Sequence, residues 1–392
     1  MDKLSILDSK YGIAVADLKE QYKKLPHFRF AMLTPALYGS GVSELACTLE
    51  GYFRELGLDC CWRPIEADKD FFVLSKKITD ALSLSMNCVS RAELDSFAAA
   101  ASSLALPLDC DVLYLHDFHA LIAASKIKGI KKIYRCHFDI SRANKDVWEF
   151  LRPYIEACDE VIFPSSQSHR PLNRGVDYIL PSIDPCSVKN TFVEREGQLA
   201  VLKNYNIPRD KPIILQVSRF DRVKDPFGLI DVFKEVSEEI PSTLVYAGGF
   251  APDDINAAAL YQELKDYAGG HKDIILLSIN RHDYEIAALQ SAADVVVQKS
   301  FSESFGLSIT EALWKRRPVA ASDVGGIRYQ IINNKTGLLC GDKESFVLNI
   351  KRLLTDRALS LRLAATGHEY VKEHFIITRE LKNHAEVFKK IV

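Results

Sequence analysis

Short apolar runs rich in β-branched residues alternate along this chain with longer stretches whose apolar residues recur every three or four positions. The short runs predict buried strands, and the longer stretches predict helices that cover a sheet. The alternation extends from about residue 28 to residue 163 and begins again at residue 212, with an irregular segment near residues 184–192 between the two series. Repeated β–α alternation indicates parallel sheets with helices on both faces. The sequence therefore predicts the α/β class, with two Rossmann-like, doubly wound domains that face each other across a cleft.

The length of 392 residues also favours more than one domain, because single hydrophobic cores rarely grow so large. We expect an N-terminal domain over residues 1–188 and a C-terminal domain over residues 189–374. The last stretch, residues 375–392, is expected to form a helix that packs back on the N-terminal domain.

Composition and charge exclude several classes of partner. Hydrophobic residues make up 47% of the chain and charged residues 26%, which is typical of a globular protein with a buried core. The formal net charge is −2 and no block of basic residues occurs, so neither nucleic acid nor an anionic membrane surface is expected as a partner. The first residues, MDKLSILDSK, lack the pattern of a secretory signal, and no later run has membrane-spanning length. We therefore expect a cytoplasmic enzyme.

The cysteine and aspartate patterns argue against a metal site. The nine cysteines form no C-x-x-C pair and most lie in apolar segments, which indicates reduced, buried thiols. Asp109 and Asp111 form a D-x-D sequence, but it leads directly into the predicted strand of residues 112–115. We interpret this pair as the solvated start of a strand. No metal ion or other cofactor is expected to be essential, although a divalent ion that stimulates the reaction is compatible with the sequence.

Residues 295–314, VVVQKSFSESFGLSITEALW, combine a predicted strand, a glycine-containing loop and the start of a helix. The β-branched run at residues 295–297 predicts the strand. The spacing of Leu307, Thr310 and Trp314 predicts a helix that Gly306 opens. The first backbone N–H groups of a helix have no partner within it, and the aligned peptide dipoles favour negative charge there. This stretch therefore predicts an anion-binding site.

Two carboxylates flank the predicted anion site. Glu303 lies in the loop before the helix, and Glu311 lies about one turn inside it. A carboxylate would repel a bare anion, but it accepts hydrogen bonds well from hydroxyl groups such as those of a sugar. Each residue taken alone is more simply interpreted as a solvated surface charge. The pair in this strand–loop–helix setting favours a nucleotide-sugar site.

Two polar pairs follow neighbouring predicted strands of the first series. His116 and Asp117 end the strand of residues 112–115, and His137 and Asp139 end the strand within KKIYRCH. A lone histidine is usually a satisfied structural residue. Ligands of doubly wound sheets, however, bind at the carboxyl ends of the strands. We therefore expect the two pairs to point into one crevice.

Glycines lie at two further strand ends. Gly39 and Gly41 follow the first predicted strand, and Gly248 and Gly249 follow the strand of residues 244–247. Glycine allows a ligand to approach the backbone closely, but a plain tight turn explains each pair equally well.

Arg219 and Lys224 bracket the turn SRFDRVKDPFG, which follows the predicted strand of residues 212–217. They are either solvated loop charges or the positive charge that a pyrophosphate at this position requires.

Several segments of both predicted domains carry a family resemblance. They are YGSGVSEL, YRCHFDISRANKDVWEFLRPYIE, LPSIDP, LQVSRFDRVKDPFGLIDVFKEV and QKSFSESFGLSITEALWKRRPVAASDVGGIRYQI, which together span roughly residues 28–340. The segment ESFGLSITE resembles the Glu-x7-Glu signature of retaining GT-B glycosyltransferases of family four. The RCHFD and SRFDRVKDPFGLIDVF blocks are similar to the trehalose synthase branch of that family.

The resemblance implies that the C-terminal domain binds the nucleotide-sugar donor. Arg219 and Lys224 would hold the pyrophosphate, Glu303 would contact the sugar hydroxyls, and Glu311 would bind the ribose hydroxyls. Backbone N–H groups at the start of the following helix would face the phosphate or the sugar. The donor-binding residues expected on this basis are Gly39, Gly41, Arg219, Lys224, Gly248, Gly249, Glu303, Phe305, Gly306, Leu307 and Glu311.

The resemblance also implies that the N-terminal domain binds the acceptor. His137 and Asp139 would lie at the reacting centre, with His137 at the transferred sugar. Asp117 and Glu44 join His137 as acceptor-side candidates. The loop reads Gly-Ser-Gly at residues 39–41, where relatives often carry consecutive glycines, so its contacts stay open. The expected catalytic residues are His137, Asp139, Arg219, Lys224 and Glu303.

The implied reaction is reversible transfer of glucose from UDP-glucose, ADP-glucose or another nucleoside-diphosphate glucose to free glucose, which forms trehalose. The path is front-face substitution without a metal, in which the departing phosphate accepts the proton of the acceptor. The relatives also suggest a homodimer. Alternatives are the same fold acting on another acceptor to make sucrose, an osmolyte or a glycan, a phosphorylase, and a non-catalytic nucleotide-sugar-binding module.

Overall fold

The structure, a computed structural model, describes residues 2–35, 41–84, 88–249, 257–279 and 282–392. The chain forms two compact units. Unit 1 consists of residues 1–181 and 378–392, and unit 2 consists of residues 182–377. The first boundary, at 181/182, lies seven residues before the expected boundary at 188/189. The second, at 377/378, lies three residues after the expected boundary at 374/375.

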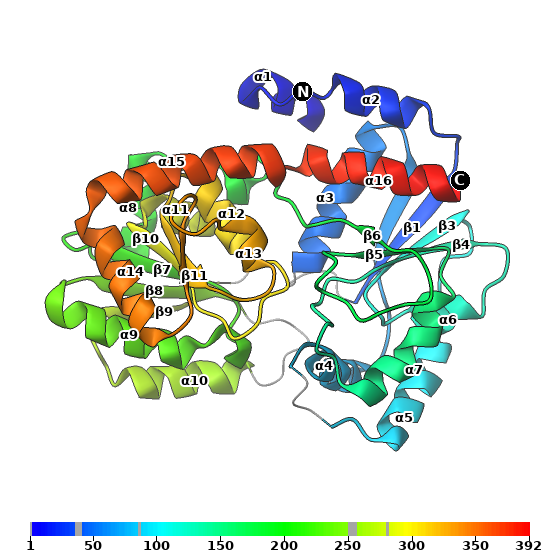
Figure 1. The fold of residues 1–392 in the computed structure, drawn as a ribbon, viewed down its shortest axis with the longest axis horizontal. Helices are drawn as coiled ribbons and strands as arrows, with labels where there is room; N and C mark the ends of the chain where they lie inside the picture. Colours follow the sequence, from blue (N-terminus) through cyan, green and yellow to red (C-terminus); the bar gives the residue numbers. More distant parts are fainter. Residues whose placement is uncertain (1, 36–40, 85–87, 250–256, 280–281) are drawn as a thin grey trace. The chain divides into compact units, whose positions relative to one another are not determined.

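Unit 1 is built on a six-stranded parallel sheet with the strand order β2-β1-β3-β4-β5-β6 (Figure 1). In the centre of this sheet β3 pairs with β4, and His116 lies opposite Arg135. The carboxyl ends of these two strands therefore lie side by side. The strands are β1 (Arg29–Thr34), β2 (Asp59–Pro64), β3 (Val112–His116), β4 (Lys131–Arg135), β5 (Glu160–Phe163) and β6 (Asp177–Tyr178).

Helices surround the sheet of unit 1, and the last helix of the chain is tied to it by a buried ion pair. Arg135 at the end of β4 contacts Glu380 of that helix at 2.6 Å, and both side chains are fully buried. Phe388, further along the same helix, packs against Phe28 and Phe30. The helices are α1 (Lys3–Tyr11), α2 (Ala16–Lys23), α3 (Gly41–Glu55), α4 (Lys69–Leu84), α5 (Arg91–Ser102), α6 (Leu121–Ser125), α7 (Lys145–Glu156) and α16 (Ile377–Ile391).

Unit 2 contains a second six-stranded parallel sheet, with the order β12-β11-β10-β7-β8-β9. Its strands are β7 (Ile213–Val217), β8 (Thr243–Gly248), β9 (Ile274–Ser278), β10 (Val295–Gln298), β11 (Val319–Ser322) and β12 (Leu338–Cys340). Its helices are η1 (Val188–Asn190), α8 (Arg195–Asn204), η2 (Arg222–Lys224), α9 (Pro226–Glu239), α10 (Ala257–Ala268), α11 (Asp283–Ala292), α12 (Leu307–Trp314), α13 (Ile327–Gln330), α14 (Lys343–Thr355) and α15 (Arg357–His374).

The predicted α/β class with two parallel sheets is confirmed, and most predicted elements lie within a few residues of their observed positions. Elements β6, β12 and α13 were not predicted, because they are too short to show a period. Helix α10 was not predicted either, although four buried residues recur there at helical spacing: Ala257, Leu260, Leu264 and Ala268.

Candidate active site

Strand β10 leads through a loop into α12, as the sequence predicted, and the turn at the start of this helix requires a glycine. Gly306 has φ of 94°, and a Cβ there would lie 3.1 Å from Cγ of Glu303. In the described part of the chain, no side-chain hydrogen bond caps this end of α12. The first N–H groups of the helix are therefore available to an anion, which the helix dipole also favours.

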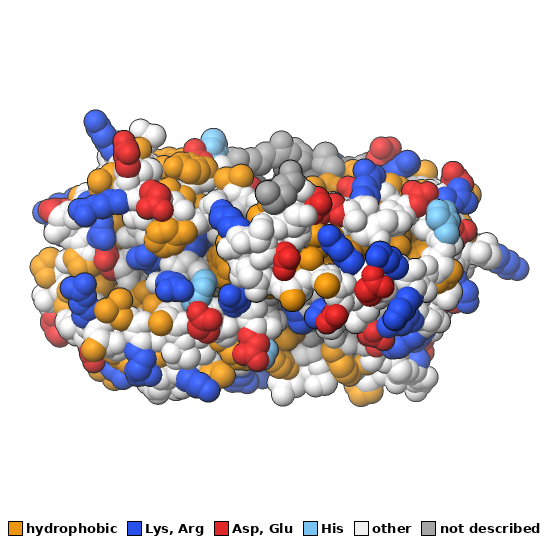
Figure 2. Space-filling model, turned by 90° about the horizontal axis from the view of Figure 1, so that it is seen from above, with side chains coloured by type: hydrophobic (Ala, Val, Ile, Leu, Met, Phe, Trp, Pro, Cys, Tyr) orange, Lys and Arg blue, Asp and Glu red, His pale blue; other side chains and the backbone are white. Residues whose placement is uncertain are grey.

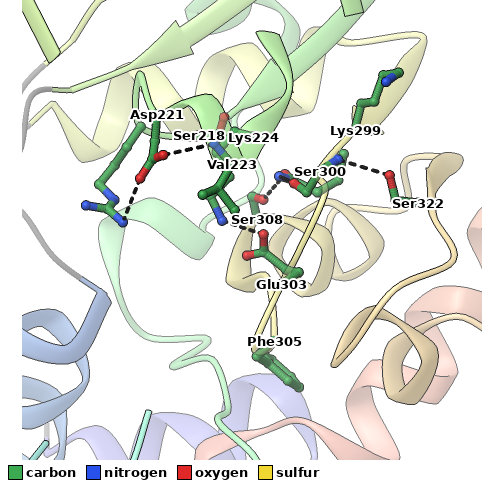
Figure 3. A network of polar contacts seen from close by, with 12 residues as sticks. Ser218, Asp221, Val223, Lys224, Lys299, Ser300, Glu303, Phe305, Ser308 and Ser322 are labelled. Carbon is green, nitrogen blue, oxygen red and sulfur yellow. Dashed lines mark hydrogen bonds and ion pairs between the residues drawn. The ribbon is translucent and has the colours of Figure 1, made fainter. Parts of the chain in front are cut away.

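Lys224 and Glu303 form an ion pair beside the start of α12 (Figure 3). The Nζ atom of Lys224, which ends η2, donates to Oε2 of Glu303 in the loop before α12. The side chain of Lys224 is 16% exposed and that of Glu303 is 9% exposed. Two residues predicted to bind the donor are thus in contact, although they are 79 positions apart in the sequence. Their opposite charges place one cation and one hydrogen-bond acceptor next to the anion-binding end of a helix.

A second ion pair lies in the same two segments of the chain as the first. Lys299 contacts the carboxylate of Asp225, and both are largely buried. The same carboxylate caps α9 by accepting from the N–H of Gly228 at 3.1 Å. The sequence analysis missed this pair, although Asp225 before Pro226 is a typical start of a helix, with a capping side chain followed by proline.

The buried amide of Gln216 joins the two loops that carry these ion pairs. Its Nε2 donates to the carbonyl of Lys224 at 3.1 Å, and its Oε1 accepts from the N–H of Lys299 at 2.8 Å. Gly326 supports the Glu303 loop from another direction, because its N–H donates to the Glu303 carbonyl at 2.8 Å. A Cβ on Gly326 would lie 2.0 Å from the carbonyl oxygen of Ser304, so only glycine fits.

Arg219 lies near the same turn but outside the buried network. Its guanidinium is 3.7 Å from the carboxylate of Asp221, and its side chain is 43% exposed. Gly248, at the end of β8, packs against the loop that carries Arg219, since a Cβ would lie 1.8 Å from the Ser218 carbonyl oxygen. This packing alone explains the glycine. Gly249 follows it and is half-buried.

Glu311 is buried inside α12 and is fully hydrogen-bonded. Its carboxylate accepts from Nζ of Lys189 at 3.0 Å and from Nε2 of Gln290 at 3.0 Å. Burial alone would raise the pKa of Glu311, but the charges of Lys189 and Lys315, together with these hydrogen bonds, outweigh burial and lower it. Glu311 is therefore an ionised, buried carboxylate and not a surface charge.

The remaining residues predicted at this loop have different surroundings. The ring of Phe305 is buried, with its centroid 5.5 Å from that of Phe375, and its carbonyl accepts from Gln330. Leu307, the first residue of α12, is half-buried. Only the backbone N–H groups here have the chemistry predicted for phosphate binding.

In unit 1, the ends of β3 and β4 bring His116, Asp117 and His137 together. Nδ1 of His116 lies 2.8 Å from Nε2 of His137, and the N–H of His137 donates to Oδ1 of Asp117 at 2.8 Å. The predicted meeting of these two strand ends is confirmed. Asp117 has φ of 62°, a left-handed conformation that costs energy for a non-glycine residue and is frequent at functional sites.

Burial sets the protonation of this cluster. It raises the pKa of Asp117 to about 7, against the opposing effects of the His137 N–H and of Arg135. It also lowers the pKa of His116 and of His137 well below the ordinary value, with a further contribution from the positive charge of Arg135. Both imidazoles are therefore neutral at physiological pH. The second oxygen of Asp117 is buried and has no hydrogen-bond partner among the described residues.

The other candidates of unit 1 have surroundings of their own. Asp139 is half-buried, and its Oδ1 accepts from the N–H of Ser141 at 3.0 Å and from its hydroxyl at 2.6 Å. Glu44 lies in the first turn of α3 and is exposed. Gly41 begins α3, whereas Gly39 lies outside the described residues.

Asp109 and Asp111 of the D-x-D sequence lie just before strand β3, as expected, and contact Arg29. Asp109 forms an ion pair with Arg29, and Asp111 accepts from the backbone N–H of Arg29 at 2.8 Å. Across the described ranges, no three His, Cys, Asp or Glu side chains are grouped so that they could hold a metal ion. The nine cysteines form no disulfide.

On the face drawn in Figure 2, basic and acidic side chains are interspersed. Of the helices in the described part of the chain, none has the length and apolar character needed to cross a membrane.

Comparisons with known proteins match both units. Residues 200–370 match the family model of group 1 glycosyl transferases, and residues 32–170 match that of the trehalose synthase N-terminal domain. The trehalose synthase of Rubrobacter xylanophilus is 34% identical over 390 residues, which cover 96% of this chain and 94% of that protein. The trehalose synthase of Pyrococcus horikoshii is 32% identical over 388 residues, which cover 96% and 93%.

Solved structures of sugar-transferring enzymes share the fold. A trehalose-6-phosphate protein from E. coli, described as bound with UDP-2-fluoro glucose, has a TM-score of 0.73 at 14% identity and covers 93% of this chain and 99% of its own. The sucrose-phosphate synthase of Thermosynechococcus elongatus has a TM-score of 0.70 at 19% identity, with coverage of 92% and 98%. Together with the curated relatives, these matches show that the chain belongs to the trehalose synthase family of GT-B glycosyltransferases.

Proposed function

We propose that this enzyme transfers glucose from a nucleoside-diphosphate glucose to free glucose and forms trehalose with retention of configuration. The observation that carries the proposal is the Lys224–Glu303 pair beside the uncapped start of α12, in a chain of this family. A cation and free helix N–H groups suit a diphosphate, and an adjacent carboxylate suits sugar hydroxyls. The UDP-2-fluoro glucose named for a neighbour makes a uridine nucleotide the first donor to test.

On the donor side, unit 2 would stabilise the charge that develops on the leaving diphosphate. Lys224 and the start of α12 lie next to each other and are fixed by the network around them. Such preorganised groups favour the transition state because they need no rearrangement when charge develops. The exposed guanidinium of Arg219 would join them when the diphosphate binds. Glu303 would accept hydrogen bonds from the transferred sugar, and Glu311 would exchange one of its present bonds for a ribose hydroxyl.

On the acceptor side, unit 1 would bind an uncharged sugar. The buried, unpartnered oxygen of Asp117 is a hydrogen-bond acceptor that a hydroxyl would satisfy. His137, which is half-buried and neutral, would contact the transferred glucose. Asp139 and Glu44 are further candidates on the acceptor side.

The proposed step is a front-face substitution. The bond from C1 of glucose to the phosphate oxygen breaks, and the bond from C1 to the acceptor oxygen forms on the same face. The acceptor proton moves to the departing phosphate oxygen, so the step needs neither an enzymic nucleophile nor a metal ion. The same groups stabilise the reverse reaction, in which a nucleoside diphosphate cleaves trehalose.

A donor and acceptor panel tests this proposal. Purified protein is given UDP-glucose, ADP-glucose or GDP-glucose, with and without glucose, and release of nucleoside diphosphate is followed with and without EDTA. We expect glucose-dependent release that EDTA does not abolish. Release with another acceptor but not with glucose would overturn the acceptor assignment, and complete loss in EDTA would overturn the metal-free path. Turnover of trehalose with inorganic phosphate and no nucleotide would identify a phosphorylase instead.

A further inference from the structure

His116 and His137 share one hydrogen bond whose proton must come from one ring. Nδ1 of His116 and Nε2 of His137 are 2.8 Å apart, and the rings are nearly parallel, with centroids 5.0 Å apart and an interplanar angle of 10°. A neutral imidazole carries hydrogen on only one nitrogen. The ring that donates therefore fixes the tautomer of both histidines.

Two arrangements satisfy the shared bond. In the first, Nδ1–H of His116 donates, which leaves Nε2 of His116 as a lone pair and puts the hydrogen of His137 on Nδ1. In the second, Nε2–H of His137 donates, which forces the hydrogen of His116 onto Nε2 and leaves Nδ1 of His137 as a lone pair. The atom that distinguishes them is Nε2 of His116.

The surroundings of that atom favour the first arrangement. Nε2 of His116 is buried and has no hydrogen-bond partner among the described residues. A buried N–H without a partner is rarer in proteins than a buried acceptor without one. The positive guanidinium of Arg135, which lowers the pKa of His116, also favours an unprotonated nitrogen nearby. The second arrangement would bury an orphan donor in a positive environment.

We propose that His116 is a positioning residue that holds His137 in the Nδ1–H tautomer, so that His137 offers a hydrogen-bond donor to the bound sugar. Nε2 of His137 is occupied by the bond to His116, so Nδ1 is the ring nitrogen left for a ligand, and the residue is half-buried. Next to it, Asp117 supplies an oxygen without a partner. The cluster then presents one donor and one acceptor, which matches a hydroxyl-bearing ligand.

The tautomer assignment concerns the free protein, whereas the sugar as ligand rests on the proposed function. The two claims therefore fail separately. A different tautomer of His137 would overturn the inference even if the enzyme makes trehalose. The predicted tautomer would stand even if the reaction proves different.

Nuclear magnetic resonance on the full-length protein labelled with ¹⁵N-histidine reads the tautomers directly. Two-bond ¹⁵N–¹H correlation spectra at pH 7.5 without ligand separate protonated from unprotonated ring nitrogens. Signals are assigned by their loss in His116→Phe and His137→Gln variants. We expect protonated Nδ1 and unprotonated Nε2 for both residues. A protonated Nε2 on His137 would overturn the proposal.

Three variants separate positioning from general structure. His116→Phe keeps a stacked ring but removes the donor, so His137 should show both tautomers. His116→Asn retains an N–H near the position of Nδ1 and should restore the single tautomer. His119→Phe is the matched control, because His119 is also buried and its Nδ1 has no partner in the described structure, so no hydrogen bond of that atom is lost. In the His119→Phe variant, the ring ¹⁵N signals of His137 should be unchanged.

The same variants also test whether the tautomer of His137 affects catalysis. By analogy with partners that orient metal-binding histidines, His116→Phe should lower kcat/KM for the nucleotide sugar by roughly 10-fold to 100-fold. His116→Asn should recover most of this loss. Equal losses in His116→Phe and His116→Asn would mean that the ring, and not its donated hydrogen, matters, and would contradict the positioning role.

Discussion

The two units share a parallel six-stranded sheet but differ in how they treat charge at the ends of their strands. In unit 2, largely buried charges occur in ion pairs, Lys224 with Glu303 and Lys299 with Asp225. In unit 1, the corresponding strand ends hold neutral imidazoles and an aspartate whose pKa burial raises to about 7. Paired charges suit a diphosphate, whereas neutral imidazoles beside a single carboxyl group suit an uncharged sugar. If the proposed function holds, one fold serves two ligands through local electrostatics and not through topology.

Unit 1 does contain a buried ion pair, but its role is to hold α16. Arg135 and Glu380 are both fully buried, and removal of one partner leaves the other as an uncompensated charge. We expect Glu380→Ala to lower the free energy of unfolding by about 3–5 kcal/mol, as measured by chemical denaturation. Glu235→Ala, which removes the exposed partner of Lys343, should cost less than about 1 kcal/mol. Equal effects of the two variants would contradict the assigned role.

Lys224→Ala tests the charge on the donor side. Loss of one preorganised group that stabilises developing charge should reduce kcat by roughly 10²–10³ while far-UV circular dichroism is unchanged. The matched control is Arg222→Ala, two residues away, whose exposed side chain pairs with Glu263. Near-normal turnover of Lys224→Ala, or an equal loss in the control, would show that this cation has no special role.

Glu311→Gln tests donor binding apart from chemistry. Glutamine keeps the shape and one acceptor oxygen but removes the charge that Lys189 and Lys315 balance. A charge-assisted hydrogen bond is stronger than a neutral one, and the difference in free energy corresponds to roughly 10-fold in affinity. We therefore expect the donor Kd to rise about 10-fold, with a smaller change in kcat, as measured by calorimetry and steady-state kinetics. A change confined to kcat would remove Glu311 from the donor site.

If Asp117 binds the acceptor, its titration should make acceptor binding depend on pH. Its raised pKa, about 7, means that the carboxyl is mostly neutral below pH 7 and mostly ionised above it. The ionised form is an acceptor only, so the oxygen that is not bonded to the His137 N–H can accept from a hydroxyl group. At saturating donor, the acceptor KM should therefore fall as pH rises from 6 to 8, by at most about tenfold per pH unit. Asp117→Asn should abolish this dependence, and persistence of the same profile in that variant would assign it to another group.

The sequence predicted the parts of both sites that follow from local pattern. Strand ends placed His116, Asp117 and His137 together, and the glycine before α12 marked the turn into that helix. These predictions succeed because the carboxyl ends of neighbouring parallel strands must meet at one edge of the sheet.

Contacts between distant segments could not be predicted in the same way. The side chain of Gln216 on β7 accepts a hydrogen bond from the N–H of Lys299, 83 residues later, and the sequence offers no signal for that bond. Glu311 looked like a surface charge in its helix because its partners come from η1 and α11. Its burial depends on packing between elements, which helical spacing does not specify.

The most direct test of the central claim is the identity of the product formed from a donor labelled with ¹³C at C1 of glucose. Full-length enzyme is incubated with this donor and unlabelled glucose, and the anomeric signals are read by nuclear magnetic resonance. We predict α,α-trehalose labelled in one of its two glucose units, with the label in the α configuration. A β-linked product, or label found only in free glucose, would contradict the account.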